Sequence, residues 1–294
     1  MDILSTRGWS DYELLDSGNE ERLERFGKYT LLRPDPQCIW IPRLSQQDWE
    51  MADAEFYKES SERGSWKVKT EMPESWEVIY KDLKFKLKLS PFKHTGLFPE
   101  QHVQWDWMRG KVKSRRSKVE SEVNILNLFA YTGGATLAAA AEGAKVTHVD
   151  ASKSAISWAR ENQAMSGLSE KPVRWILDDA MKFVSREIKR GVRYDGIILD
   201  PPIYGHGPTG ETWDLMRDLP KLLNLCQQVL SEHPLFVVVN AYAVSASSIM
   251  LENTLQTALR NQKGSTSCGE LVLEESTGGR QLSTGIFGRW EAQS

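Results

Sequence analysis

Residues Asn124–Asp150 read NILNLFAYTGGATLAAAAEGAKVTHVD, and this stretch decides the fold. Its opening apolar run is typical of a buried parallel strand, which Gly133-Gly134 ends. Most side chains of Ala135–Ala141 are single methyl groups. This predicts a helix that lies close to a sheet and offers its amide-rich N-terminus to an anion. Lys145–Val149 predicts a second strand, and Asp150 follows at its carboxyl end, where open α/β sheets bind ligands. The stretch therefore predicts a βαβ unit with a nucleoside site, in which Asp150 can accept both hydroxyls of a ribose.

The glycine turn indicates which nucleoside ligand this unit binds. A dinucleotide site uses Gly-x-Gly-x-x-Gly, so that the backbone can approach a pyrophosphate. Here residues Phe129–Gly134 read FAYTGG and contain only two adjacent glycines. A ligand with adenosine but no pyrophosphate fits better, and S-adenosylmethionine is the common one. Taken alone, the segment leaves open an ordinary α/β turn followed by a chance aspartate.

The composition of the 294-residue chain is that of a globular protein with one large domain or two. Its three cysteines, Cys38, Cys226 and Cys268, are far apart and have neither metal-ligand nor disulfide spacing, so we expect a reducing cytoplasm and no metal. No segment has the length and apolarity of a signal peptide or a membrane span. The net charge of −3 argues against a protein that coats nucleic acid.

Three parts follow one another along the chain. Residues 1–108 hold seven of the eleven tryptophans, and their strand-like runs predict a small β-rich domain with a hairpin at Glu77–Leu89 and a short helix at Glu20–Arg25. Residues 122–294 alternate strands and helices and close with two strands. This pattern predicts a Rossmann-like α/β domain with a seven-stranded, mostly parallel sheet and an antiparallel edge strand. Residues 109–121 between them are predicted to be a basic linker.

The basic linker is a candidate RNA contact. Its cations could track the phosphates of a nucleic acid or simply face solvent. They are Arg109, Lys111, Lys113, Arg115, Arg116 and Lys118.

A second chemical signal, Asp200-Pro201-Pro202, stands at the end of a predicted strand, Tyr194–Leu199. Proline has a fixed φ and no N–H, so the pair forms a stiff wall whose carbonyls no helix or sheet consumes. Beside a methyl donor, the Asp200 carboxylate and the Pro201 carbonyl could accept hydrogens from a nucleophilic nitrogen and orient its lone pair. The alternative is that the prolines merely end the strand. The glycine-rich loop 203–213 that follows is predicted to be a lid.

Four motifs occur in order on these predicted elements: FAYTGG at 129–134, DAS at 150–152, DDA at 178–180 and DPP at 200–202. Together they resemble the class I S-adenosylmethionine-dependent methyltransferases, and more narrowly the bacterial 23S rRNA large-subunit methyltransferase group. The segment HTGLFPEQ at 94–101 is similar to that group's Thr-Gly-x-Phe-x-x-Gln element. The resemblance covers about residues 75–292, and the N-terminal part resembles that group's small β-rich domain. No segment resembles the additional RNA-binding module that some members carry in front.

The resemblance implies S-adenosylmethionine as cofactor and a role for each matching residue. The 129–134 turn would face the methionine part, Asp150 would hold the ribose, and Asp179 with the Ala180 amide would hold the adenine. Phe98 and Gln101 would close the pocket from the domain junction. For Asp178-Asp179, an N-cap of the following helix is an alternative role that can coexist with this one. The implied cofactor-binding set is Phe98, Gln101, Phe129, Tyr131, Thr132, Gly133, Gly134, Asp150, Ala151, Ser152, Asp179, Ala180 and Asp200.

One departure from that group bears on the substrate. Its cytosine-C5 enzymes use a cysteine after the fifth strand or at the Asp-Pro-Pro position, but this chain has Asn240-Ala-Tyr242 and Ile203 there. The spacing around Cys226 predicts a core position on a helix. A nitrogen of an RNA base is therefore the favoured target, and rRNA the favoured substrate.

The predicted catalytic residues are Asp200, Pro201 and Tyr204, with Tyr204 stacking on the base. His206 is a further candidate base, and Asn240 and Tyr242 are candidate pocket residues. Two other functions stay open: methylation of a small molecule or protein, and nucleotide binding without catalysis in a protein of the same fold.

Overall fold

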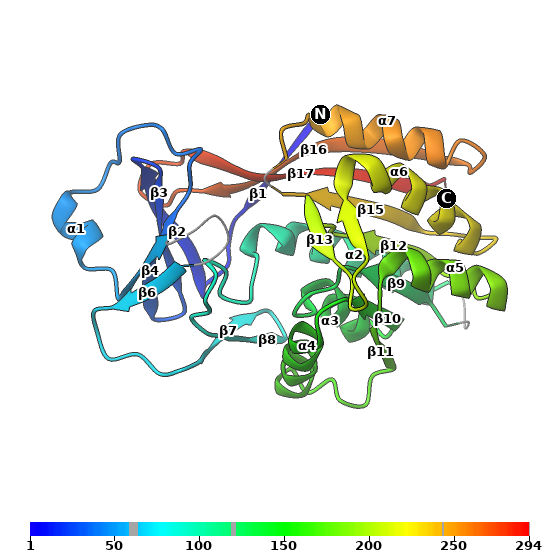
Figure 1. The fold of residues 1–294 in the computed structure, drawn as a ribbon, viewed down its shortest axis with the longest axis horizontal. Coiled ribbons are helices and arrows are strands. Elements are labelled where there is room, and N and C mark those ends of the chain that lie inside the picture. Colours follow the sequence, from blue (N-terminus) through cyan, green and yellow to red (C-terminus); the bar gives the residue numbers. More distant parts are fainter. Residues whose placement is uncertain (59–63, 119–121, 243, 294) are drawn as a thin grey trace. The chain divides into compact units, whose positions relative to one another are not determined.

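The computed structural model describes residues 1–58, 64–118, 122–242 and 244–293, which form two compact units (Figure 1). The larger unit comprises Met1–Leu4, Gln101–Leu271 and Thr284–Ser294, and the smaller unit comprises Ser5–Glu100 and Val272–Ser283. Along the chain the two units divide after Leu4, Glu100, Leu271 and Ser283, and the domain boundary expected at residue 108 stays a prediction. The C-terminal strands β16 (Gly264–Glu274) and β17 (Gln281–Ala292) contribute residues to both units.

The larger unit is built on an eight-stranded sheet in the order β1-β16-β17-β15-β12-β9-β10-β11. Its parallel strands are β9 (Asn124–Leu128), β10 (Lys145–Asp150), β11 (Val173–Leu177), β12 (Gly196–Leu199) and β15 (Phe236–Ala241). Strand β17 runs antiparallel to β15. The predicted α/β class is confirmed, with two differences in detail. Strand β1 (Asp2–Thr6) adds an eighth strand, and the antiparallel strand β17 lies inside the sheet and not at its edge.

The central strands of this sheet are mostly buried and apolar. Every residue of β12 and β15 is buried, as expected for parallel strands that are packed on both faces. Helix α2 packs beside α3, and α5, α6 and α7 follow one another side by side (Figure 1). The helices are α2 (His102–Arg116), α3 (Gly134–Ala141), α4 (Lys153–Met165), α5 (Ala180–Arg190), α6 (Leu215–Cys226) and α7 (Ser248–Ala258).

Two segments of the larger unit differ from their predictions. The predicted basic linker is helical over 109–116, as the second half of α2, because Trp105, Met108 and Val112 recur at helical spacing and are buried. The predicted lid loop contains a short hairpin, in which β13 (Tyr204–His206) pairs with β14 (Thr212–Asp214).

The smaller unit is mainly antiparallel, as predicted. Its five-stranded sheet has the order β2-β3-β4-β5-β6, and a separate hairpin pairs β7 with β8. The bounds are β2 (Tyr12–Gly18), β3 (Glu21–Phe26), β4 (Tyr29–Pro34), α1 (Gln46–Glu50), β5 (Ala54–Lys58), β6 (Gly64–Val68), β7 (Trp76–Tyr80) and β8 (Leu83–Leu87). The predicted hairpin is confirmed by β7 and β8.

The helix predicted at Glu20–Arg25 is wrong, because these residues form strand β3. Two of its charged side chains, Arg22 and Glu24, are buried, and Glu24 pairs with Arg22 and Arg33. Burial alone would raise the pKa of Glu24, but the two guanidinium groups hold that pKa below its ordinary value. The charge run therefore marks a buried ion cluster and not a solvated helix face.

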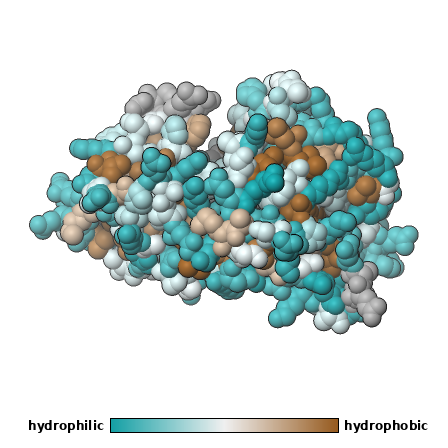
Figure 2. All heavy atoms as spheres, turned by 90° about the horizontal axis from the view of Figure 1, so that it is seen from below, coloured by the Kyte–Doolittle hydropathy of each residue, from teal (hydrophilic) through white to brown (hydrophobic). Residues whose placement is uncertain are grey.

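The surface is predominantly hydrophilic in the view of Figure 2, where apolar residues form small separate patches. Among the helices of the described residues, none is long and apolar enough to cross a membrane.

Candidate active site

The candidate site lies at the carboxyl ends of three neighbouring strands. Strand β9 pairs with β10 on one side and with β12 on the other, so that Leu128 is level with both Val149 and Leu199. The chain turns in opposite directions from β9 and β12, which is the switch point where open α/β sheets bind ligands. The Phe129–Gly134 turn, Asp150 and Asp200 each follow one of these strands, and they therefore meet at one edge.

The turn after β9 has an unusual backbone. Two of its non-glycine residues, Phe129 (φ 55°) and Tyr131 (φ 47°), are left-handed, as is Gly133 (φ 90°). A left-handed conformation costs a residue with a side chain about 1–2 kcal/mol. The Ala130 N–H donates to the Val149 carbonyl at 3.1 Å, and the Gly133 N–H to the Ala130 carbonyl at 3.0 Å. Such strain is typical of ligand-binding turns that the surrounding structure holds in place.

Both glycines of the turn are required by packing. A Cβ atom on Gly134 would lie 2.3 Å from Cζ2 of Trp105, so the missing side chain lets α2 approach the start of α3. On Gly133 a Cβ atom would lie 3.1 Å from Cβ of Ala159, at a φ that disfavours any side chain.

Asp150 is fixed in orientation by this turn. Its Oδ2 accepts the Tyr131 N–H and its Oδ1 accepts the Ser152 N–H, both at 2.8 Å. Burial raises the pKa of the Asp150 carboxyl above its ordinary value, and the backbone N–H groups of Ser152 and Tyr131 counteract part of this rise. A carboxylate has about four acceptor positions. The backbone N–H groups therefore leave part of this acceptor capacity for the ribose hydroxyls.

A group of buried polar side chains supports the turn from behind. Asn162 Nδ2 donates to the Thr132 carbonyl at 2.9 Å. Thr136 Oγ1 accepts from Asn127 Nδ2 at 2.9 Å and lies 2.9 Å from His148 Nδ1. Burial lowers the pKa of His148 to about 3, so the ring is neutral and can accept the Thr136 hydroxyl proton. The sequence did not predict Asn127, Thr136, His148 and Asn162 as site residues, because their pairing depends on the fold.

The Asp178-Asp179 pair takes the N-cap role that the sequence left open. Asp179 caps α5, since its Oδ1 accepts the Lys182 N–H at 2.9 Å. The Asp178 N–H donates to the Asp150 carbonyl at 3.1 Å, and its carboxylate pairs with Arg186. Asp179 and the buried Ala180 are thus anchored next to the strand that ends in Asp150, while their adenine contacts stay a prediction.

Asp200 continues β12 beside the turn. Its N–H donates to the Leu128 carbonyl at 3.4 Å, and its Oδ2 lies 3.5 Å from Gln101 Nε2. Gln101 was predicted near the cofactor, and the structure places it at Asp200. Phe98 belongs to the smaller unit, where its ring lies 5.0 Å from that of His94, and its part in the pocket stays a prediction.

The hairpin after Asp-Pro-Pro is anchored at its base. Trp213 Nε1 donates to the Pro202 carbonyl at 2.7 Å, and the Trp213 ring packs 4.9 Å from Phe129. Farther along, Lys182 of α5 pairs with Glu211. The predicted lid is therefore a hairpin with contacts at its base, on which Tyr204 is 73% exposed and His206 is also exposed.

Cys38, Cys226 and Cys268 are all buried and free, and Cys226 belongs to the core that α6 contributes to. Burial raises the pKa of the Cys226 thiol well above its ordinary value. In the described part of the chain, no cluster of three His, Cys, Asp or Glu side chains could hold a metal ion.

Most cations of the predicted basic patch form ion pairs or hydrogen bonds with other parts of the larger unit. Arg109 pairs with Glu142 at 2.8 Å, and Lys111 pairs with Glu291. Arg116 donates to the Glu142 carbonyl at 2.9 Å, and Arg115 to that of His233 at 3.2 Å. Lys113 and Lys118 are exposed.

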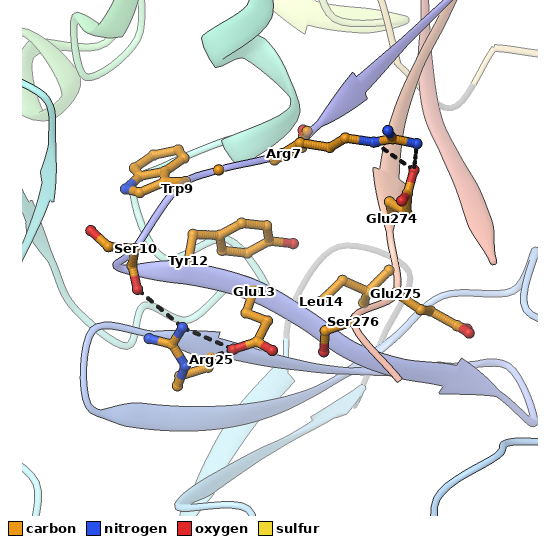
Figure 3. A pocket seen from close by; sticks show the side chains of 12 residues that line it. Arg7, Trp9, Ser10, Tyr12, Glu13, Leu14, Arg25, Glu274, Glu275 and Ser276 are labelled. Carbon is orange, nitrogen blue, oxygen red and sulfur yellow. Dashed lines mark hydrogen bonds and ion pairs between the residues drawn. The ribbon is translucent and has the colours of Figure 1, made fainter. Parts of the chain in front are cut away.

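A separate hollow of about 470 Å³ lies within the smaller unit (Figure 3). Its charged side chains are already paired, Arg7 with Glu274 at 2.5 Å and Arg25 with Glu13 at 2.9 Å. Trp9, which also lines it, is buried. None of the predicted site residues contributes to this hollow.

Comparison with known proteins assigns the family. The sequence model of the S-adenosylmethionine-dependent methyltransferases matches residues 44–262, well over half of the chain. The chain belongs to this family. It is an S-adenosylmethionine-dependent methyltransferase, and S-adenosylmethionine is its cofactor, as the motifs predicted.

Individual relatives support this assignment. The chain is 36% identical over 159 residues to the ribosomal RNA large subunit methyltransferase K/L of Shewanella frigidimarina, which covers 53% of this chain and 21% of that protein. It thus spans about a fifth of the length of the curated relatives it matches. The crystal structure of the SAM-dependent methyltransferase from Agrobacterium tumefaciens has 41% identity and a TM-score of 0.95, over 100% of this chain and 94% of that one. A putative methyltransferase from Streptococcus mutans (16% identity, TM-score 0.73, 97% and 76% covered) shares the fold.

Proposed function

We propose that this methyltransferase acts on a nitrogen of an RNA base, with ribosomal RNA as the substrate and the cytoplasm as its location. One observation carries the proposal. Asp200-Pro201-Pro202 ends β12 directly beside the strained turn of β9, and the anchored hairpin that follows presents the exposed Tyr204. A methyl acceptor can therefore be held between a carboxylate, a proline carbonyl and an aromatic ring.

The chain's own residues fit the cofactor. When bound, S-adenosylmethionine supplies a methyl group on a positively charged sulfur. Asp150 would hold the ribose, since both of its oxygens are oriented by backbone N–H groups and keep acceptor capacity. The Phe129–Gly134 turn would hold the methionine part, with Ala151 and Ser152 completing the wall next to Asp150. Asp179 would hold the adenine amino group with the carboxylate oxygen that does not cap α5.

Asp200 and Pro201 would act by positioning the base that receives the methyl group. The Asp200 carboxylate and the Pro201 carbonyl would accept the N–H groups of the base and aim its lone pair at the methyl group. Asp200 would also stabilise the positive charge that develops on the nitrogen. No step needs a covalent enzyme intermediate, which agrees with a nitrogen target because the described cysteines are buried.

The base has to leave its stack to reach this edge, at a cost of a few kcal/mol. Stacking on an aromatic side chain returns about 1–3 kcal/mol per base, and Tyr204 is free to provide it because 73% of its surface is exposed. Lys113 and Lys118 are the residues of the basic patch best exposed to contact RNA phosphates. The relative named as a ribosomal RNA methyltransferase supports RNA as the polymer.

Transfer of a labelled methyl group tests the proposal. Purified protein is incubated with methyl-labelled S-adenosylmethionine and ribosomal RNA from cells that lack the gene, and the digested RNA is examined by nucleoside mass spectrometry. The expected product is one N-methylated nucleoside, formed much more slowly by Asp200→Asn. Label on C5 of cytosine would refute the nitrogen target. Label only in protein or small molecules would favour the alternative substrate class.

A further inference from the structure

A chain of hydrogen bonds runs through the larger unit and ends on Asp200. It begins at Arg289 on β17, whose Nε donates to Gln104 Oε1 at 2.7 Å. Gln104 Nε2 donates to Asn240 Oδ1 at 3.0 Å, and Asn240 Nδ2 donates to Gln101 Oε1 at 3.0 Å. Gln101 Nε2 then faces Asp200 Oδ2 at 3.5 Å. Each bond points the same way, from the cation toward the carboxylate.

The chemistry of the two ends fixes this direction. A guanidinium group only donates hydrogen bonds, and an ionised carboxylate only accepts them. Each amide between them must therefore turn its oxygen toward Arg289 and its NH₂ group toward Asp200. Gln104 is 1% exposed and Asn240 is 3% exposed, so water cannot replace a lost bond. In such a buried series, each bond polarises the next and strengthens it.

Arg289 is held in place to begin the series. Its guanidinium carbon lies 4.5 Å from the ring centre of Trp107 and 5.0 Å from that of Phe287. Burial lowers the pKa of Arg289 to about 10, so the side chain is still a cation at neutral pH.

We propose that Arg289 is a positioning residue for methyl transfer, which acts through Gln104, Asn240 and Gln101 to keep an N–H group facing Asp200. The inference rests on the proposed function of Asp200. With one oxygen oriented by Gln101, the carboxylate keeps one rotamer and directs its remaining acceptor capacity at the base. The 3.5 Å separation is expected to shorten when the site is filled, because catalytic hydrogen bonds are often long before substrate binds.

Gln104→Glu tests the direction of the series at constant shape. The glutamate still accepts from Arg289, but it cannot donate to Asn240. Asn240 must then turn its NH₂ group toward residue 104 and its oxygen toward Gln101. Gln101 turns in response and presents its carbonyl to Asp200, where two oxygens repel each other. One buried change therefore reverses the group that faces the carboxylate, two side chains away.

The reversal is visible without any RNA. In protein labelled with ¹⁵N in glutamine side chains, Gln104→Glu should shift the Gln101 NH₂ resonance strongly. The matched control is Gln163→Glu, a buried glutamine of α4 whose Nε2 donates to the carbonyls of Leu168 and Lys171. This control should leave the Gln101 resonance in place. An unshifted Gln101 resonance in Gln104→Glu would overturn the inference, whatever the activity.

Single-turnover methyl transfer to ribosomal RNA from cells lacking the gene tests the consequence. Gln104→Glu should slow transfer about ten- to a hundredfold, the range for a lost hydrogen bond to a charged group. Arg289→Met should behave alike, and Arg289→Lys should recover part of the rate because it keeps the cation.

The Asp200→Asn background separates the two claims. There Gln104→Glu should cause no additional slowing, because its effect passes through Asp200. If the two effects multiply, the inference is refuted and the function of Asp200 stands. If Asp200→Asn alone transfers methyl groups at the wild-type rate, the proposed function of Asp200 is refuted instead.

Discussion

Replacing Asp150 with asparagine tests the ribose contact at constant shape. The carboxylate is held by the Tyr131 and Ser152 N–H groups at 2.8 Å each, so its remaining lone pairs have a fixed direction. Asparagine removes the charge and exchanges one acceptor oxygen for a donor. Hydrogen bonds to a charged group contribute about 1.5–3 kcal/mol, and neutral ones about 1 kcal/mol. Losing one ribose bond and weakening the other costs about 3 kcal/mol, or roughly a hundredfold in the dissociation constant.

The assay is calorimetric titration with S-adenosylhomocysteine. The matched control is Asp195→Asn, because Asp195 also accepts two hydrogen bonds, from the Asn124 N–H at 2.8 Å and the Ser231 hydroxyl at 2.7 Å, but at the amino ends of the strands. Asp195→Asn should bind like the wild type. Equal dissociation constants for the two variants would refute the ribose contact.

The pH dependence of the same titration gives a second test. Burial raises the pKa of Asp150, so this group becomes protonated at a higher pH than an ordinary aspartate. A protonated carboxyl loses acceptor capacity, and affinity for S-adenosylhomocysteine should therefore fall as the pH falls through this raised pKa. For stability the sign is opposite, because an acid whose pKa is raised on folding makes the ligand-free fold less stable as the pH rises through that pKa. Asp150→Asn should consequently lose affinity at neutral pH but show no further fall in affinity as the pH falls through this pKa.

Three further predictions concern packing, a buried base and the exposed ring. Gly134→Ala should lower the unfolding free energy by about 1–3 kcal/mol in urea titrations, since the new Cβ would lie 2.3 Å from the Trp105 ring. The control Gly110→Ala lies inside α2, where the new Cβ meets no atom within 4 Å, and it should raise the unfolding free energy by about 0.5–1 kcal/mol. Destabilisation by both variants would contradict the packing argument. His148 has a pKa of about 3 against an ordinary 6.5, so acidification favours the unfolded chain by about 1.4 kcal/mol per pH unit below 6.5. His148→Gln should therefore lose less unfolding free energy between neutral and acid pH. An unchanged slope would mean that the ring is not buried in its neutral form. Tyr204→Ala should keep thermal stability and S-adenosylhomocysteine affinity but slow methyl transfer to RNA; an unchanged rate would remove the stacking role.

The α/β core could be predicted from the sequence because its signals are local. The helix predicted at Ala135–Ala141 and the strand predicted at Lys145–Val149 each differ by one residue from α3 and β10. In the smaller unit, strand β3 could not be predicted, because its buried Arg22 and Glu24 depend on a partner from another strand, Arg33.

For the site, the sequence predicts which residues share one edge of the sheet. Asp150 and Asp200 stand at the ends of β10 and β12, the parallel strands on either side of β9, so strand order alone brings them to one edge. The left-handed backbone at Phe129 and Tyr131 leaves no residue-type signal, since neither is glycine. The series of hydrogen bonds from Arg289 to Asp200 joins α2, β15 and β17. Its first bond, from Arg289 to Gln104, links residues that are 185 positions apart in the sequence, so only the folded sheet shows it.

Nucleoside mass spectrometry of ribosomal RNA from cells with and without the gene shows whether this protein methylates a base nitrogen. We expect that one N-methylated nucleoside disappears without the gene, returns with the wild-type gene and does not return with Asp200→Asn. Identical nucleoside profiles in the two strains would contradict it.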